Sequence, residues 1–515
     1  MADIPPPAAT RSMLGRLLDG IERSGNRLPD PVYIFMVLCL IILLASWACG
    51  LAGVSAINPA TGKTVVVDNL LDREGLVRIV REAINNFSAF PPLGVVLATM
   101  IGVGVAEKSG WFEAMMRATV ARAPRAFIIP VIILIGILGN MAGDAAIVVL
   151  PPIAAVVFIR LGYHPIAGLA VAYATTEGGF AANLLVGITD VLALSFTAPA
   201  AALIDDTLPL NAAMNYYFIA VSTLLLLGVA WWVTMRIVIP RLGHWTPSSA
   251  DHGTDEVREA VTAAERRGMR AANIALALMT VLLLALSLPE GAPLRNPDTG
   301  LLLDDSPLME GIILIVTVFF LVPGVVYAWG AGTARNGNDI ARWMGESMAS
   351  MGGYIVIIFF AAQMLAFFKW SNLGTVLAIK GASALADQSG VTLIIGIVLL
   401  TAIINLLIGS SSAKWAVLAP IFVPMMMLLD FHPAFTQMVY RVGDSLTNPV
   451  TPMEPYIVLV LAYAQRYVPG FRLGSLIATL LPYTVAFAIS WTALLVLWYL
   501  LGWPVGPGGP IHLGH

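Results

Sequence analysis

The stretch from Asn405 to Pro455 reads NLLIGSSSAKWAVLAPIFVPMMMLLDFHPAFTQMVYRVGDSLTNPVTPMEP and joins apolar runs through polar interruptions. A small polar tip, Gly409 to Ser412, breaks the first apolar run, and His432-Pro433 ends the second. Two ionisable residues, Arg441 and Asp444, follow within a third run. In a bilayer, buried polar backbone and ionisable groups persist only beside protein, water or ligand. The stretch therefore predicts a binding site inside a membrane.

The composition of the whole chain places this stretch in a polytopic membrane protein. Of 515 residues, 58% are hydrophobic and 11% are charged, and the mean hydropathy is +0.84. A soluble protein carries about 25% charged residues. The net charge of −3 gives no sign of a nucleic-acid partner. Both cysteines, Cys39 and Cys49, fall in the first apolar run, where one helix would keep them too far apart for a disulfide.

An earlier segment, residues 139–168, repeats the organising stretch without a gap. It reads GNMAGDAAIVVLPPIAAVVFIRLGYHPIAG, and its His164-Pro165 aligns with His432-Pro433 at an offset of 432 − 164 = 268 positions. We read both histidines as helix-start residues rather than metal ligands. Interrupted apolar segments at corresponding positions of two halves indicate the substrate site of a transporter. The other identities pair Ala145, Val149, Leu150, Pro152, Ile153 and Leu161 with Ala413, Val417, Leu418, Pro420, Ile421 and Leu429.

Arginine placement predicts how the chain crosses the membrane. Residues 1–31 carry four arginines and are expected in the cytoplasm, and a basic cytoplasmic linker at 241–269 divides a first half, 32–240, from a second half, 270–502. Re-entrant hairpins at about 126–160 and 390–430 would enter from opposite faces. The predicted fold is an all-α polytopic membrane protein with nine transmembrane helices and two opposed re-entrant hairpins in an inverted repeat. The tail 503–515 is expected outside. Spans are expected near 32–55, 91–107, 165–186, 213–237, 271–288, 307–329, 350–368 and 473–501, with one more after 433.

The second half supplies candidate ligands for a coupling cation. Asp444 and Arg441 are three residues apart, so one helix face can carry both. Asp444 would bind Na⁺ or take a proton, while Arg441 meets an anionic substrate or balances Asp444; the alternative is a buried structural ion pair. Asn405, with the carbonyls and hydroxyls of Gly409 and Ser412, offers neutral oxygen ligands of the kind Na⁺ uses. At Gly409 and Ser412 the alternative is ordinary satisfaction of a turn.

The first half offers weaker counterparts. At its tip, Asn140 would contact substrate, and Asp144 is either a cation ligand or an N-cap of the returning half-helix. The next helix contains TTEGGFAANLLVGITD, in which Thr176-Glu177 aligns with Asp444-Ser445. A glycine pair and an asparagine there predict an unwound section. Asp190 lies just beyond it, either in the substrate pathway or at the interface.

Three further residues complete the candidate substrate site, and two prolines flank the helix that carries Asp444. Trp415 lies just past the second tip, where its indole would stack on an aromatic substrate; the alternative is a packing tryptophan. Ser410 and Ser411 would hold substrate carboxylates near the start of the returning half-helix. Pro433 and Pro452 bracket the Asp444 helix, and we interpret them as structural hinges.

Several motifs resemble those of the p-aminobenzoyl-glutamate transporter (AbgT) family. They are GNRLPDPVYIF from Gly25, GGFAANL from Gly178, AFFKWSNLGTVLAIKGA from Ala366, and GSSSAKWAVLAPIFVPM through RVGDSLTNPVTPM. The resemblance covers nearly the whole chain and implies a dimer with nine spans and two opposed hairpins. It also implies transport of p-aminobenzoyl-glutamate, a folate breakdown product, or export of sulfonamide antimetabolites. Functional positions of the family correspond to Asp190, Asn405, Trp415, Pro433, Arg441, Asp444 and Pro452.

Together these observations predict a cation-coupled secondary carrier of the bacterial inner membrane, working as symporter or antiporter on a Na⁺ gradient or the proton motive force. The N-terminus would be cytoplasmic and the C-terminus periplasmic, and no cofactor is expected. One rival is a carrier of simple dicarboxylates on the same architecture. Another is an intramembrane enzyme with Glu177 and Asp444 as acid and base, which lacks a nucleophile or metal set. The sequence leaves the direction of transport open.

Overall fold

A computed structural model describes residues 31–57, 62–139, 144–243, 245, 261–302, 306–406, 408–451, 454 and 456–514. Helices dominate this part of the chain, and six of them are long and apolar enough to cross a membrane. All six correspond to predicted spans, and the chain is a multi-pass membrane protein. They are α2 (Pro31–Leu51), α10 (Tyr216–Val233, continued by a π-helical turn at Thr234–Val238 and by α11, Ile239–Leu242), α12 (Ala263–Ser287), α14 (Ile312–Ala331), α16 (Gly352–Trp370) and α22 (Leu473–Leu501).

The remaining three predicted spans are shorter or broken. One is α4 (Pro91–Lys108). The second, predicted at 165–186, is helical only in α8 (Pro165–Gly178), so the break predicted in the glycine-bearing segment is present. A further helix that was not predicted, α9 (Ile188–Ala201), follows beyond these bounds. The third is divided into α20 (Pro433–Leu446), a 3₁₀ turn at Asn448–Val450 and α21 (Tyr456–Tyr467). The total of nine spans stays a prediction.

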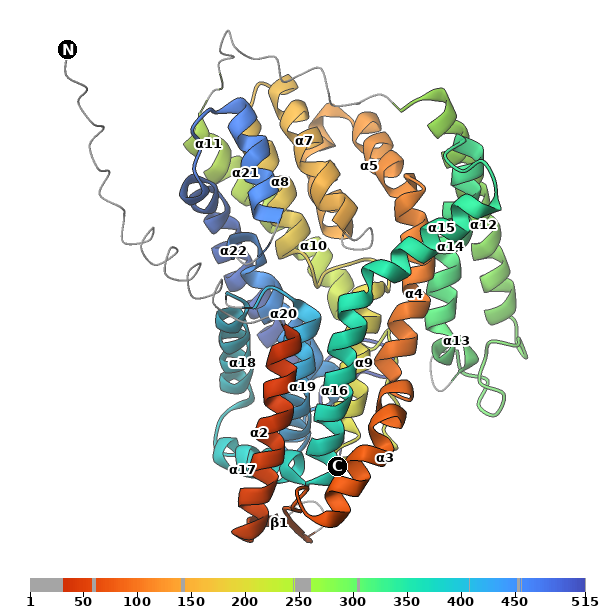
Figure 1. The fold of residues 1–515 in the computed structure, drawn as a ribbon. Helices are drawn as coiled ribbons and strands as arrows, with labels where there is room; N and C mark the ends of the chain where they lie inside the picture. Colours follow the sequence, from red (N-terminus) through yellow and green to blue (C-terminus); the bar gives the residue numbers. More distant parts are fainter. Residues whose placement is uncertain are drawn as a thin grey trace, which may run out of the picture.

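Two pairs of short apolar helices stand where the hairpins are predicted. The first pair is α6 (Ile128–Leu138) and α7 (Asp144–Arg160), and the second is α18 (Gly390–Asn405) and α19 (Ser411–Met427). In Figure 1, α7 and α8 lie in the upper half of the molecule, and α18 and α19 lie in the lower half. This is the arrangement that opposed hairpins require. Their entry from opposite faces of a membrane stays a prediction.

The helix that follows each pair begins in the same way. The Nδ1 atom of His164 accepts the backbone N–H of Ile166 at 3.2 Å, and Nδ1 of His432 accepts that of Ala434 at 3.1 Å. Each histidine precedes a proline at the first helical position, where the missing N–H costs nothing. Both histidines are therefore N-caps, as predicted from the repeat.

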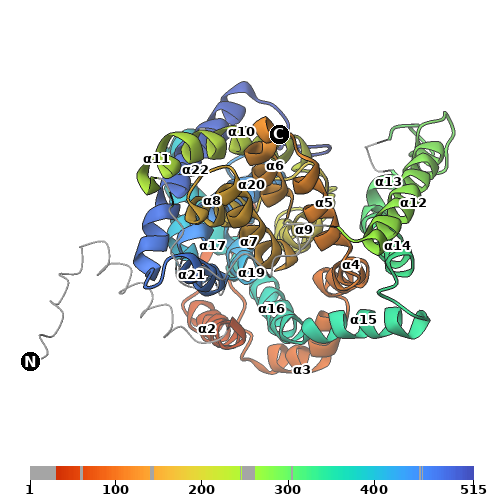
Figure 2. The same cartoon turned by 90° about the horizontal axis from the view of Figure 1, so that it is seen from above.

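The other elements surround this core. Figure 2 shows α12 and α14 standing to one side, with α4 between them and the rest. The two helices approach closely at glycine: a Cβ on Gly330 would lie 2.8 Å from Cα of Gly268. Smaller elements are the antiparallel strands β1 (Ser55–Ile57) and β2 (Thr64–Val66), the helices α3 (Arg73–Ser88), α5 (Trp111–Arg122), α13 (Pro307–Glu310), α15 (Gly337–Ser350) and α17 (Leu373–Leu385), and a 3₁₀ turn at Arg125–Phe127.

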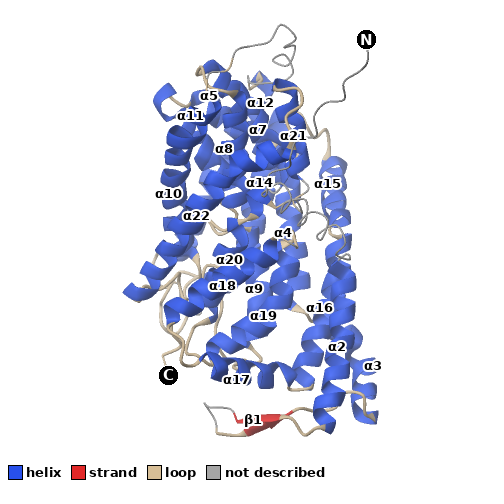
Figure 3. Cartoon of the chain, turned by 90° about the vertical axis from the view of Figure 1, so that its left-hand side faces the viewer, coloured by secondary structure: helices blue, strands red, loops and turns tan. Residues whose placement is uncertain are grey.

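The C-terminal tail is an ordered part of the fold. It lies at the same end of the molecule as the β1–β2 hairpin (Figure 3). Its Val505 carbonyl accepts the N–H of Phe218 at 3.0 Å, and its Ile511 carbonyl accepts the N–H of His432 at 2.8 Å. Val505 and Ile511 are buried. The tail therefore ties the start of α20 to the start of α10.

Candidate cation and substrate site

The end of α18, the first turn of α19 and the last turn of α20 meet at three buried polar residues, Asn405, Lys414 and Asp444. The Nζ atom of Lys414 lies 2.6 Å from Oδ1 of Asp444 and donates to Oδ1 of Asn405. Burying an ion pair is costly unless each charge is also well solvated by neighbouring polar groups. Asn405 and Asp444 thus converge on the ammonium of Lys414, and their binding of a coupling cation stays a prediction.

The amide of Asn405 is held in one orientation. Its Nδ2 atom faces three oxygens, the Asp444 carbonyl at 2.8 Å, Thr447 Oγ1 at 2.9 Å and Asn448 Oδ1 at 2.6 Å. Asn448 in turn donates to the carbonyl of Glu177 at 3.3 Å. An amide carries its donors and its acceptor on different atoms, so these contacts direct Oδ1 of Asn405 toward Lys414. Asn448 thereby links the second half of the chain to the end of α8 in the first half.

Arg441 pairs with the first half of the chain rather than with Asp444. Its Nη1 atom is 2.5 Å from Oδ1 of Asp190, and its Nη2 atom is 3.4 Å from Oγ1 of Thr189. The other carboxylate oxygen of Asp190 accepts the N–H of Gly187 at 2.7 Å, at the start of α9. Asp190 is therefore buried beside Arg441, and its part in the substrate pathway stays a prediction. The expectation that Arg441 balances Asp444 is wrong in this structure, because Lys414 holds Asp444.

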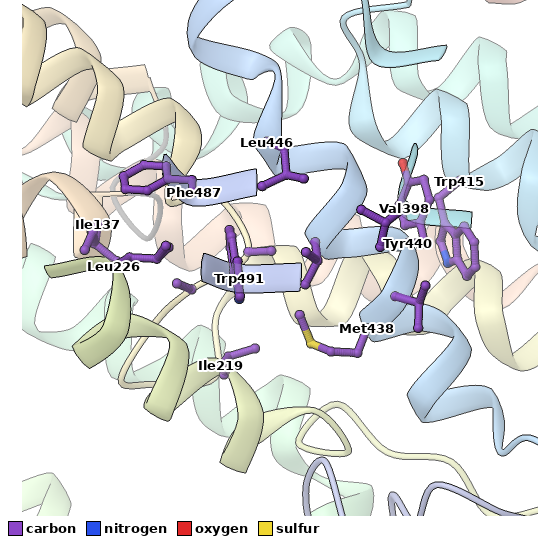
Figure 4. Close-up of a cluster of buried hydrophobic side chains, with 14 of the residues drawn as sticks. Ile137, Ile219, Leu226, Val398, Trp415, Met438, Tyr440, Leu446, Phe487 and Trp491 are labelled. Atoms are coloured by element: carbon purple, nitrogen blue, oxygen red, sulfur yellow. The ribbon is translucent and has the colours of Figure 1, made fainter. Parts of the chain in front are cut away.

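A cavity of about 140 Å³ lies beside these charges. The Trp415 and Tyr440 rings are stacked on each other in its wall, with centroids 4.2 Å apart and planes at 22° (Figure 4). A cavity of about 150 Å³ is known to take one benzene ring. The described conformation thus has room for one aromatic ring beside a guanidinium. The wall is completed by Phe180, Ala181, Thr189, Leu192, Ala193, Phe196, Ser411, Ser412, Arg441 and Asp444.

A chain of hydrogen bonds fixes the indole of Trp415. Its Nε1 donates to Oγ1 of Thr197 at 2.9 Å, and Thr197 Oγ1 lies 2.6 Å from Oε1 of Gln437. Gln437 donates to Oδ1 of Asn215 at 2.6 Å, and Asn215 donates to the carbonyl of Ala434 at 2.7 Å. Buried polar networks of this kind rigidify a site when every member is satisfied. The cavity wall is therefore fastened to the starts of α10 and α20.

Replacing Trp415 with Phe should separate the role of the ring from that of the N–H. We expect the free energy of unfolding in detergent to fall by about 1–3 kcal/mol, because Thr197 loses its buried donor. Affinity for an aromatic ligand should change little, since a ring remains to stack. Trp232→Phe, at an exposed tryptophan of α10, is the matched control. A Trp415→Phe protein as stable as the parent would contradict a structural role for the N–H.

The other predicted residues lie near helix starts or outside the described part of the chain. Ser410 N-caps α19, its Oγ accepting the N–H of Ala413 at 3.3 Å, and Gly409 precedes it in the link from α18. Pro433 is the first residue of α20. Asp144 begins α7, but its side chain is outside what the structure describes. Asn140 and Pro452 also lie outside the described residues.

A second cavity, of about 640 Å³, lies between α3, α9 and α16. It is lined by two basic residues, Arg78 and Lys369, and the guanidinium of Arg78 lies 4.4 Å from the ring centroid of Trp370. Pro199 of α9 belongs to its wall and stands one helical turn from Phe196, which lines the smaller cavity. The same helix thus borders both spaces.

Comparison with known proteins identifies the group to which this architecture belongs. The family model described as "AbgT putative transporter family" matches residues 16–513. The chain belongs to the AbgT family of transporters. The resemblance drawn from the motifs is therefore confirmed. Membership of the AbgT family favours transport over the intramembrane enzyme considered from the sequence.

Relatives within the AbgT family match over nearly their whole length. The p-aminobenzoyl-glutamate transport protein of Escherichia coli is 37% identical over 510 residues, 99% of this chain and 98% of that one. The crystal structure of the Alcanivorax borkumensis YdaH transporter, described as having an unusual topology, is 42% identical, with a TM-score of 0.89 over 93% of this chain and 100% of that one. Neisseria gonorrhoeae MtrF, described as illuminating a class of antimetabolite efflux pumps, is 40% identical, with a TM-score of 0.90 over 96% and 100% of the two chains.

Proposed function

We propose that the protein is a cation-coupled secondary transporter that carries p-aminobenzoyl-glutamate, or exports sulfonamide antimetabolites, across the bacterial inner membrane. One observation carries the proposal: a stacked aromatic pair, a guanidinium and a carboxylate border a single cavity between two broken helical segments. Buried ionisable groups in a membrane segment are costly and indicate function. The names of the E. coli and N. gonorrhoeae relatives fit both substrate classes.

The cavity has a partner for each chemical part of such a substrate. An aminobenzoyl or sulfanilyl ring would stack on Trp415, where offset aromatic contacts are favourable. A carboxylate would meet the guanidinium of Arg441 and the first turn of α19, whose free N–H groups and helix dipole favour anions. The basic lining of the larger cavity, Arg78 and Lys369, would draw the anion toward this site.

The size of the smaller cavity points to movement during transport. A space of about 140 Å³ accepts one ring and leaves no room for the glutamate part of p-aminobenzoyl-glutamate. The two hairpin-bearing segments would therefore move against the scaffold to admit the whole substrate and alternate its access. Asp444 would carry the coupling ion, Na⁺ or H⁺. The working unit would be a homodimer, with the N-terminus in the cytoplasm and the C-terminus in the periplasm.

Flux into proteoliposomes tests this proposal. Labelled p-aminobenzoyl-glutamate is supplied while a Na⁺ gradient and a pH gradient are imposed separately. We expect one gradient to drive accumulation above the equilibrium level, and the recovered label to be chemically unchanged. Unlabelled sulfonamide should compete and a simple dicarboxylate should not. Competition by the dicarboxylate alone would reassign the substrate, and accumulation under neither gradient would overturn coupled transport of this compound.

A further inference from the structure

Lys414 occupies the position in which an inorganic cation would be coordinated. Its ammonium is bound by Oδ1 of Asp444 and Oδ1 of Asn405, one anionic and one neutral oxygen. The Lys414 side chain has no exposed surface, and Asp444 is 1% exposed. Carboxylate and amide oxygens are also the hard ligands that Na⁺ prefers. The two oxygens therefore suit either cation.

The ammonium of Lys414 and Na⁺ cannot bind the Oδ1 atoms of Asn405 and Asp444 at the same time. Two positive charges bound by the same pair of oxygens repel each other, and the repulsion is strong in a buried site of low polarity. The Nδ2 atom of Asn405 is held by three oxygens, so Oδ1 cannot turn toward a second position. The hydroxyl of Tyr440 is directed to the Ser411 carbonyl at 2.7 Å and lies 3.3 Å from Oδ1 of Asp444, which restrains the carboxylate as well.

A displaced ammonium and an entering cation both have space nearby. Asp444, Ser411 and Ser412 line the cavity of about 140 Å³, which supplies hydroxyl oxygens and room for water beside the carboxylate. The ammonium of Lys414 is carried by a flexible four-carbon side chain in the first turn of α19, so it can move away from Asn405 and Asp444 while the helix stays in place. Exchange at this site therefore needs a side-chain movement only.

We propose that Lys414 is a tethered cation that competes with an inorganic monovalent cation for Asn405 and Asp444, so that Na⁺ binds there only after the ammonium has left. The proposal deepens the proposed function by naming the residue that sets the cation affinity of the coupling site. It concerns binding, which is measurable in detergent without any flux. A failure of transport in proteoliposomes therefore leaves this test unaffected.

The test removes the ammonium and titrates Na⁺. Parent, Lys414→Met and Lys414→Gln proteins are purified in choline chloride, and the thermal unfolding midpoint and ²²Na⁺ binding are followed as NaCl replaces choline chloride. We expect both variants to bind Na⁺ at a concentration lower than the parent requires by a factor of about 5 to 150. Adding Asp444→Asn to Lys414→Met should abolish the response. Lys380→Met, at an exposed lysine of α17, is the matched control and should behave as the parent.

Several results would overturn the proposal. Equal Na⁺ dependence in parent and variants, or no Na⁺ response in either variant, would show that Lys414 does not compete for the site. A response that survives in the Lys414→Met/Asp444→Asn protein would place the Na⁺ elsewhere. If the single variants fold poorly, their yield is compared in the two salts: recovery in NaCl supports competition, and equal loss in both salts overturns it.

Discussion

Asp444→Asn should abolish gradient-driven flux and lower the free energy of unfolding by about 3–5 kcal/mol. The substitution leaves the buried ammonium of Lys414 without its counter-charge, 2.6 Å from the former carboxylate oxygen. Removing one partner of a buried pair costs far more than removing both. Flux should stop because no carboxylate remains to exchange one cation for another. Unfolding is followed in detergent, and flux in proteoliposomes.

A double variant separates the two effects of this change. In Lys414→Met/Asp444→Asn both charges are gone, so stability should return toward that of the parent while coupled flux stays absent. Asp387→Asn, at an exposed aspartate after α17, controls for the substitution itself. Gradient-driven flux that persists in Asp444→Asn would remove this residue from the coupling site. An unchanged free energy of unfolding would argue against the buried pair with Lys414.

Asp190→Asn should be similarly destabilising and should make the protein unusually responsive to anionic ligand. Arg441 then keeps a buried charge whose partner, 2.5 Å away, has been neutralised, at a cost of about 3–5 kcal/mol. A substrate carboxylate placed on the guanidinium supplies the missing charge. Ligand that binds only the folded state stabilises it by mass action. The thermal shift caused by p-aminobenzoyl-glutamate should therefore be larger in Asp190→Asn than in the parent.

The control for this experiment removes the guanidinium too. Asp190→Asn/Arg441→Gln should regain stability, because no unpaired charge remains, and should lose the enlarged thermal shift. Asp206→Asn, at an exposed aspartate beyond α9, should match the parent in both measurements. If ligand stabilises Asp190→Asn no more than the parent, the substrate carboxylate does not meet Arg441.

Features that depend on neighbouring residues could be predicted from the sequence. The repeat located both histidine N-caps correctly, because capping is local and follows from His-Pro at a helix start. Asn405 and Asp444 were expected to lie together because polar residues in apolar helices must find partners, and Nδ2 of Asn405 does donate to the carbonyl of Asp444. The glycine pair after Glu177 marked the end of α8, since glycine interrupts helices at small steric cost.

The sequence could not show which carboxylate pairs with each buried cation, because that pairing depends on how the helices cross. Arg441 and Asp444 are three residues apart, which favoured pairing between them, yet the partner of Arg441 is Asp190, 251 positions earlier in the chain. Lys414 was overlooked as a functional residue, although a lone lysine between apolar runs is itself a signal. The partner of each cation depends on how α9, α19 and α20 cross, and the number of residues between two side chains in the sequence does not determine that crossing.

The ordered tail has a consequence for how the helices can move. The carbonyl of Ile511 accepts the N–H of His432, and the carbonyl of Val505 accepts that of Phe218. Residues 505–511 therefore act as a strap between the starts of α10 and α20, and both ends of this strap are buried. A rearrangement that separated these two helix starts would have to break one of the two backbone hydrogen bonds, so small displacements of α20 should be transmitted to α10.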